Sequence, residues 1–303
     1  MKKTQIGKSD LQVSAIGLGC MSLGTDERNA QEIIEVALEE GINYFDTADL
    51  YDFGENEKIV GQSLKNVRED VIIATKAGNR WNDRKDGWSW DPSKHYIKEA
   101  VKQSLKRLQT DYIDLYQLHG GTIDDPIDET IEAFEELKAE GFIRYYGISS
   151  IRPNVIREYI QKSNIISVMM QYSMLDRRPE EESLSLLNKH NISVVTRGSV
   201  AKGLLSNKFA EKISDNGFLD YHKEELQNLL PLLKENLASS RPLEEVALQY
   251  NLTHPAVASV VTGASSVQQV RANAQAVRSQ PLSSKEIDFI QKVTKANRYN
   301  AHR

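Results

Sequence analysis

Asp46 and Tyr51 stand in the stretch NYFDTADLYDFGENE (residues 43–57), which is the part of the chain best suited to acid–base chemistry. The apolar residues Tyr44 and Phe45 come after a glycine that can end a helix. Asp46 is therefore expected at the carboxyl end of a short strand, and Tyr51 in the loop beyond it. A phenol has an ordinary pKa of about 10, so it donates a proton near neutral pH only beside a positive charge. A cation removed from water needs a carboxylate in turn. The stretch therefore predicts a site that a cation from elsewhere in the chain completes.

Two further polar residues are expected at the same edge of the fold. Lys76 directly follows the apolar segment VIIAT, and His119 directly follows IDLYQL. In a parallel barrel the carboxyl ends of all strands meet on one face, so both side chains should lie near Asp46 and Tyr51. Taken singly, the four have ordinary explanations as a surface lysine, a core histidine, a capping aspartate and a half-buried tyrosine. Unrelated residues have no reason to gather at the ends of successive strands, so we favour a catalytic group.

The composition is that of a globular protein with a large core. The 303 residues are 40% hydrophobic and 27% charged, with a formal net charge of -5. No long block of Lys or Arg is present, so neither nucleic acid nor an anionic membrane is an expected partner. Cys20 is the only cysteine, which excludes an intrachain disulfide and a Cys-rich metal site. The amino-terminal residues carry no apolar stretch and no later run approaches membrane-spanning length, so we expect a soluble cytoplasmic protein.

Short apolar segments alternate along the chain with segments of helical periodicity, which is typical of α/β proteins. A small hairpin is expected first, with strands at 4–6 and 11–13. The later apolar segments predict strands at 14–19, at Tyr44, and at 71–75, 113–118, 145–149, 168–171, 192–196 and 258–262. Eight strands that alternate with helices are most simply a (β/α)8 TIM barrel, which we expect residues 1–303 to form as a single domain. A doubly wound open sheet is the rival, but Gly17-Leu18-Gly19 lacks the third glycine of the dinucleotide fingerprint.

Three helix boundaries carry recognisable signals. Asn29 with Glu32 predicts a capping box at the first helix. Pro179 predicts the start of the helix after the sixth strand. Ser283 with Glu286 predicts an extra helix at the carboxyl end of the chain.

Two long insertions, 77–92 and 197–241, follow strands on the expected active face. Loops on that face carry function in barrels, so these insertions are the expected walls of a substrate pocket. The first contains Trp81, Trp88 and Trp90, which either line the pocket or anchor the loop.

The chain resembles the aldo-keto reductases in six stretches that occur in family order over nearly its entire length: GLGCMSLG, NYFDTADLYDFGENE, VIIATKAG, SLKRLQTDYIDLYQLH, GFIRYYGIS and VVTGASSVQQVRAN. The resemblance implies an NADPH-dependent barrel oxidoreductase that acts on a small aldehyde or ketone. It implies Tyr51 as the proton donor, tuned by Lys76 and Asp46, while His119 orients the carbonyl. The alternative is a regulatory or sensor subunit that holds NADP(H) on the same barrel without turnover. We expect a monomer.

The resemblance also assigns residues to the cofactor. Ser149 and Gln171 match positions that bind the nicotinamide carboxamide, and bonds to nearby loops explain them equally well. Arg197 stands where the family often has an aromatic ring against the nicotinamide, and a planar guanidinium can stack there. Residues 198–203 match the loop over the pyrophosphate. The full expected set is Gly19, Cys20, Met21, Asp46, Ser149, Gln171, Arg197, Gly198, Ser199, Lys202, Gly203, Gly263, Ser265, Gln269 and Asn273.

The segment 263–273 matches the site for the adenosine phosphate, where backbone groups before a helix favour an anion. No acidic residue occurs in 262–273, whereas an NAD site commonly uses Asp or Glu to bind the free ribose hydroxyl. NADPH is therefore expected over NADH, on the strength of Ser265 and Arg271. Gln269 stands where some relatives have Arg, so we expect the discrimination to be modest.

Metal and acyl-transfer chemistry are not expected. The sequence contains no phosphate-binding Walker loop and no serine nucleophile elbow. No metal-ligand spacing occurs among the remaining histidines, which are His95, His190, His222, His254 and His302.

Overall fold

Eight of the apolar segments form a closed ring of strands in the computed structural model, which describes residues 1–303. The strands of the ring are β3 (Ile16–Gly19), β4 (Tyr44–Asp46), β5 (Ile72–Ala77), β8 (Ile113–Leu118), β9 (Ile143–Ser149), β10 (Ser167–Gln171), β11 (Ser193–Arg197) and β12 (Val257–Gly263). Neighbours pair in parallel in chain order, and β12 pairs with β3 to close the ring. The (β/α)8 barrel is therefore confirmed, and the open sheet is wrong.

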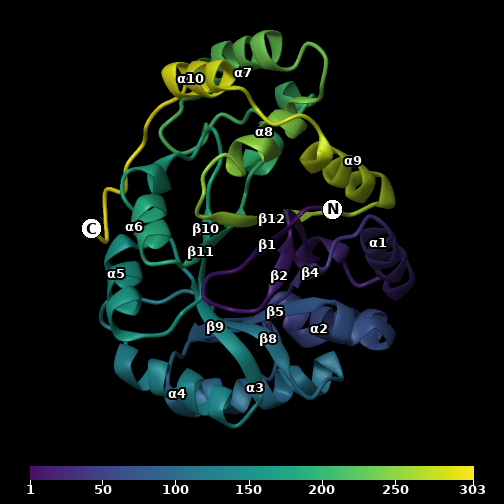
Figure 1. Ribbon diagram of the computed structural model, residues 1–303, viewed down its shortest axis with the longest axis vertical. Coiled ribbons are helices and arrows are strands. Elements are labelled where there is room, and N and C mark those ends of the chain that lie inside the picture. The colour runs from purple at the N-terminus through teal and green to yellow at the C-terminus, as the bar shows by residue number, and fades with distance from the viewer.

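Helices surround the ring and bury apolar faces against it, while the two helices Lys223–Leu237 and Ser284–Val293 pack against each other farther out (Figure 1). In α1, for example, Ala30, Ile33 and Ala37 are completely buried at helical spacing. The helices are α1 (Glu27–Glu39), α2 (Glu55–Leu64), α3 (Lys94–Leu108), α4 (Ile127–Ala139), α5 (Pro153–Lys162), α6 (Ser183–Lys189), α7 (Lys223–Leu237), α8 (Leu243–Asn251), α9 (Val267–Arg278) and α10 (Ser284–Val293). None of them has both the length and the apolar character that a membrane crossing requires.

The expected amino-terminal hairpin is present as β1 (Lys3–Gln5) and β2 (Gln12–Ser14), and Figure 1 shows it over the centre of the ring. Its turn carries Ile6 and Leu11 into a core that lies inside the barrel, separate from the core between barrel and helices. Gly7 has a φ of +53°, and a β-carbon there would lie 2.2 Å from the Ile166 carbonyl oxygen. Only glycine allows so close an approach. With Ile6 and Leu11 in the inner core, the hairpin closes the amino-terminal end of the barrel.

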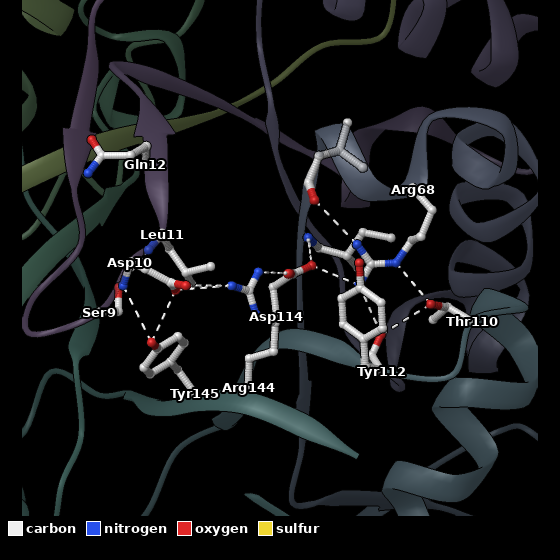
Figure 2. A network of polar contacts seen from close by, with 12 residues as sticks. Ser9, Asp10, Leu11, Gln12, Arg68, Thr110, Tyr112, Asp114, Arg144 and Tyr145 are labelled. Carbon is white, nitrogen blue, oxygen red and sulfur yellow. Dashed lines mark hydrogen bonds and ion pairs between the residues drawn. The ribbon is translucent and has the colours of Figure 1, made fainter. Parts of the chain in front are cut away.

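A network of charged groups joins this hairpin to the barrel (Figure 2). At its centre is the buried carboxylate of Asp114 on β8, which accepts a hydrogen bond from the Ile73 N–H and pairs with Arg68 and Arg144. Arg144 on β9 also makes two 3.0 Å hydrogen bonds to Asp10 in the hairpin turn. The side opposite the strand carboxyl ends is therefore built for stability.

Several boundaries differ from the expected ones. The cap of α1 is Asp26, whose side chain accepts from the Asn29 N–H, so the capping box predicted at Asn29 is wrong. Pro179 lies in a 3-10 turn, η4 (Arg178–Glu180), and α6 begins only at Ser183. The capping box of Ser283 and Glu286 is confirmed at α10. Part of the first insertion folds into an unexpected hairpin, β6 (Asn79–Trp81) with β7 (Trp88–Trp90).

Candidate active site

The carboxylate of Asp46, the ammonium of Lys76 and the phenol of Tyr51 form one hydrogen-bonded row. Asp46 ends β4, Lys76 lies near the end of the neighbouring strand β5, and both are buried. Lys76 Nζ lies 2.5 Å from Asp46 Oδ1, 2.8 Å from the Thr47 carbonyl oxygen and 3.4 Å from Tyr51 Oη. An ammonium has three donors, so each is directed to one of these acceptors and the lysine is held in place.

The charge of Lys76 is set by these neighbours. Burial alone would lower the pKa of Lys76, but the Asp46 carboxylate and the Tyr51 phenol raise it above its usual value. The lysine therefore stays positively charged although it is buried beneath the tyrosine.

His119 follows β8 and stands edge-on to Tyr51, with ring centroids 5.9 Å apart and planes at 83°. Its Nδ1 is buried without a hydrogen-bond partner, and its side chain lines the same cavity as Tyr51. Burial, together with the charges of Lys76 and Arg197, lowers the pKa of His119 to about 3. The imidazole is therefore neutral near pH 7 and can donate one hydrogen bond into the cavity.

Gln117 belongs to this group and was missed in the sequence. Its side chain points inside the barrel from β8, where Nε2 lies 3.5 Å from Asp46 Oδ2 and Oε1 has no partner. A polar residue in the apolar strand IDLYQL is the signal that could have identified it.

A second buried cluster supports the loop after β4. The Asp49 N–H donates to the Lys76 carbonyl at 3.1 Å, and Asp49 Oδ2 accepts from the Tyr96 hydroxyl at 3.2 Å. Asp49 Oδ1 has no partner, while Arg107 is paired with Glu57 at 2.7 Å. Burial and the charge of Glu57 raise the pKa of Asp49 to about 8, so this carboxyl is largely protonated at neutral pH.

A cavity of about 1020 Å³ opens over Tyr51, Lys76 and His119. The two insertions expected as walls both contribute: Trp88 and Trp90 come from the first, and Arg197, Leu219 and Asp220 from the second. The Trp90 Nε1–H also donates to Asp125 at 3.0 Å, so Trp90 lines the cavity and anchors the loop.

A third wall, absent from the sequence prediction, is the carboxyl-terminal segment 298–302. It runs from α10 past α6 to α5 (Figure 1). The Arg177 N–H donates to Asn297 and the Asn154 N–H to the His302 carbonyl, both at 2.9 Å, so this segment is fixed to the barrel. It has no apolar periodicity, so nothing in its sequence indicates where it lies.

Ser149, Gln171 and Arg197 end the successive strands β9, β10 and β11, which brings them to one side of the barrel mouth. Ser149 and Arg197 line the cavity. Both ends of the Gln171 amide are engaged, because Nε2 donates to Asp176 at 2.8 Å and Oε1 accepts from Arg197 at 3.1 Å. Gln171 therefore orients Arg197 in this structure.

The loop 198–203 follows Arg197. Gly198 has a φ of +70°, and a β-carbon there would lie 3.1 Å from the Gln171 side chain. The Ser199 hydroxyl is buried and donates to Asn251, which leaves its backbone rather than its side chain for a ligand. Lys202 is exposed, makes no ion pair and precedes Gly203, whose φ is +89°. The loop thus offers a free cation and open backbone.

The segment after β12 leads into α9. The Ser265 N–H and hydroxyl both donate to Gln269 Oε1, at 2.8 and 3.3 Å, and Ser266 is the cap of α9. Asn273 Nδ2 donates to Thr262 at 3.2 Å. Ser265 and Gln269 are part of the exposed amino-terminal end of α9, where the helix dipole favours an anion.

The end of β3 lies beside the end of β12. A β-carbon at Gly263 would lie 2.3 Å from the Ser22 hydroxyl oxygen, and one at Gly19 3.0 Å from Val261. Cys20 is buried, whereas Met21 is 63% exposed and lines the cavity.

These positions fit a nicotinamide dinucleotide. They run along the barrel mouth from Ser149 and Arg197, past the glycine-lined loop with Lys202, to the helix end at Ser265. Polar groups that could hold an amide, a cation that could hold a pyrophosphate and helix N–H groups that could hold a further phosphate thus follow the ends of β9 to β12.

Comparisons with known proteins agree with this geometry. A model of the aldo/keto reductase family matches residues 15–295. An uncharacterized oxidoreductase of Bacillus subtilis (strain 168) is 61% identical over 307 residues, which cover 100% of both chains. The NADH-specific methylglyoxal reductase of Escherichia coli (strain K12) is 32% identical, with 91% of this chain and 94% of the relative covered. The solved holo form of an aldo-keto reductase from Bacillus halodurans has 63% identity and a TM-score of 0.95, covering 100% of this chain and 99% of that one.

Proposed function

Because the chain belongs to the aldo/keto reductase family of oxidoreductases, we propose that it uses NADPH to reduce an aldehyde or ketone to an alcohol. The observation that carries this proposal is the row of Asp46, Lys76 and Tyr51 at the floor of a cavity that His119 also lines. A protein that only binds a nucleotide has no need for an acid, a cation and a carboxylate matched in this way.

A bound reduced nicotinamide supplies the hydride that the carbonyl carbon accepts. Negative charge then grows on the carbonyl oxygen, to which Tyr51 donates its proton. Lys76, hydrogen-bonded to Tyr51 Oη at 3.4 Å, stabilises the phenolate that this transfer leaves. Asp46 keeps Lys76 charged, and neutral His119 donates a hydrogen bond that orients the same carbonyl oxygen. In the oxidation direction the proton moves the other way, from the alcohol to Tyr51.

The test is a spectrophotometric assay that follows the loss of NADPH absorbance with a panel of aldehydes, ketones and quinones. We expect turnover with at least one class. Tyr51→Phe should lower kcat by about 100-fold or more while cofactor affinity is retained, because only the proton donor is removed. Unchanged turnover in Tyr51→Phe would refute the assignment. Tight cofactor binding without turnover across the panel would favour a regulatory subunit.

The preference for NADPH rests on the amino-terminal end of α9. The exposed Ser265 hydroxyl, which could turn from the Gln269 amide to a ligand, and the helix N–H groups suit a 2'-phosphate, and no carboxylate stands in 262–273 to repel one. Arg271 is 3.9 Å from Glu39 in an exposed ion pair, which is weak enough to leave the guanidinium available. A single charge-assisted contact contributes about ten- to a hundredfold in affinity.

Titration of NADPH and NADH into the wild type and Ser265→Asp tests this choice. A carboxylate at position 265 should weaken NADPH binding through like-charge repulsion and leave NADH binding nearly unchanged. The comparison matters because one relative, the Escherichia coli reductase, is NADH-specific. A wild type that binds both cofactors equally well would contradict the proposal.

A further inference from the structure

The cavity is far more cationic than the chain as a whole. The chain has a formal net charge of -5. Yet one carboxylate, that of Asp220, lines the cavity together with the cationic side chains of Lys76, Arg152, Arg178, Arg197 and Arg298.

Three of these cations already have an acidic partner. Lys76 is paired with Asp46, as described above. Two hydrogen bonds of 2.7 Å join Arg178 to the buried carboxylate of Asp176. Arg298, in the carboxyl-terminal wall, lies 3.8 Å from a surface glutamate. Their charges are therefore compensated by the protein itself, in whole or in part.

Arg152 and Arg197 have no acidic partner. Each makes a side-chain hydrogen bond only to a neutral oxygen, Arg152 to the Gly121 carbonyl and Arg197 to Gln171 Oε1. A guanidinium has five N–H donors, so most donors of both groups remain available to a ligand. Under the proposed function Arg197 would hold the nicotinamide, which leaves Arg152 as the uncompensated cation for the substrate.

The position of Arg152 separates it from the cofactor's phosphates. It lies between β9 and α5, and the carbonyl that it binds is two residues beyond His119. The residues that fit phosphates follow β11 and β12, which are two and three strands away from β9 around the ring. Arg152 therefore faces the part of the cavity beside the group that orients the carbonyl.

Apolar side chains also line this cavity. Met21, Trp88 and Leu219 belong to it although they are 63%, 57% and 43% exposed. Large exposed apolar groups that gather around one cavity mark a surface for an apolar ligand. A compound with an apolar body and one negative charge matches both the apolar and the cationic side chains of this lining.

We propose that Arg152 determines specificity by binding a carboxylate of the substrate, so that the preferred substrates are oxo acids with an aryl or alkyl body. This inference rests on the proposed function and names its substrate class. A planar guanidinium binds a carboxylate through two parallel hydrogen bonds, which fixes the orientation of the substrate as well as its affinity.

The experiment compares ortho-, meta- and para-carboxybenzaldehyde with their methyl esters, by kcat/KM at saturating cofactor. The three isomers scan the distance between the reacting carbonyl and the charge, and each ester is a neutral match of its acid. In the wild type we expect at least one acid to exceed its ester about ten- to a hundredfold. Raised salt should reduce that preference.

Arg152→Gln keeps an N–H donor for the Gly121 carbonyl but removes the charge. It should abolish the preference for the acid and leave kcat/KM for the ester within about twofold, whereas Arg152→Lys should retain an intermediate preference. Arg157→Gln is the matched control, because Arg157 lies in the first turns of α5, the helix that begins directly after Arg152, pairs with Glu182 at 2.9 Å and does not line the cavity. Its preference should equal that of the wild type.

Two results would overturn the inference: no acid preferred over its ester in the wild type, or an equal loss with acid and ester in Arg152→Gln. The second result would mean that Arg152 only braces the loop at Gly121. Absence of cofactor oxidation with every carbonyl compound would instead overturn the proposed function, and this inference with it.

Discussion

At the scale of single residues, His119 should not change its charge between pH 5 and pH 8. Its pKa is lowered to about 3 by burial and by the charges of Lys76 and Arg197, against an ordinary value near 6.5. Proton NMR of the imidazole signals should show one histidine whose shifts stay constant over this range, and that signal should be missing in His119→Gln. An imidazole that titrates near pH 6.5 and disappears with this substitution would contradict a neutral His119.

Removal of the Lys76 charge alone should cost more stability than removal of the whole ion pair. Lys76→Met leaves the Asp46 carboxylate buried without a cation, which typically costs about 3–5 kcal/mol of unfolding free energy. Asp46→Asn combined with Lys76→Met has no unpaired charge, so it should recover much of that loss. Urea unfolding of the two single variants and the double variant measures the difference. Additive losses would show that the pair is not coupled.

At the scale of elements, the loop after β4 makes a contribution to the unfolding free energy that depends on pH. The pKa of Asp49 is about 8 in the folded protein and about 3.9 in an unfolded chain, so between these values only the folded state holds the proton. The contribution of Asp49 to stability is therefore complete below pH 4 and is lost as the pH rises towards 8, by about 1.4 kcal/mol per pH unit.

Asp49→Asn has no proton to lose, so its unfolding free energy should fall less steeply with pH than that of the wild type. Urea unfolding at pH 5, 6, 7 and 8 gives both curves, and all other titrating groups cancel in the comparison. The amide can still accept from the Tyr96 hydroxyl, which keeps the local geometry. Parallel curves would show that Asp49 is already ionised at pH 5.

The network at the opposite end of the barrel should affect stability without affecting turnover. Asp114→Asn replaces the carboxylate that pairs with Arg68 and Arg144, and it leaves two guanidinium groups without that partner (Figure 2). We expect a loss of about 2–5 kcal/mol in unfolding free energy, with kcat unchanged at a temperature where the variant is folded. Asp10→Asn is the control, because that carboxylate is exposed and should contribute less than about 1 kcal/mol. A fall in kcat at full folding would link the two ends of the barrel.

The elements of the barrel were predictable from the sequence because its strands are buried on both faces and appear as continuous apolar runs. The boundaries of the elements were less predictable, because Asp26 and Asn29 are both able to cap a helix and only the packed structure decides between them. Among site residues, Asp46, Tyr51, Lys76 and His119 follow or end apolar runs, which placed them on one face. Arg152 and the segment 298–302 carry no such signal, because they meet the cavity only through the three-dimensional path of the chain.

At the scale of the whole molecule, we propose that residues 1–303 act as one domain and as a monomer. All walls of the cavity and the hydrogen-bonded row of Asp46, Lys76 and Tyr51 come from one copy of the chain, so no partner is needed to complete the site. Light scattering after gel filtration should therefore give a mass near 34.3 kDa at the concentrations used in assays. A concentration-independent dimer would contradict this expectation.

The pairing of β12 with β3 has a consequence for the chain while it is being made. The partner of one of the first strands is about 240 residues away, and at roughly 5–20 residues per second a ribosome needs on the order of ten seconds or more to supply it. During that time β3 has an open edge on a growing sheet, which is where nascent chains associate wrongly. On ribosomes stalled so that β11 has emerged but β12 has not, the nascent chain should therefore be sensitive to protease. Protection should arise only once residues 257–263 have emerged. The wait for β12 makes the nascent chain, rather than the finished barrel, the form of this protein most in need of a chaperone.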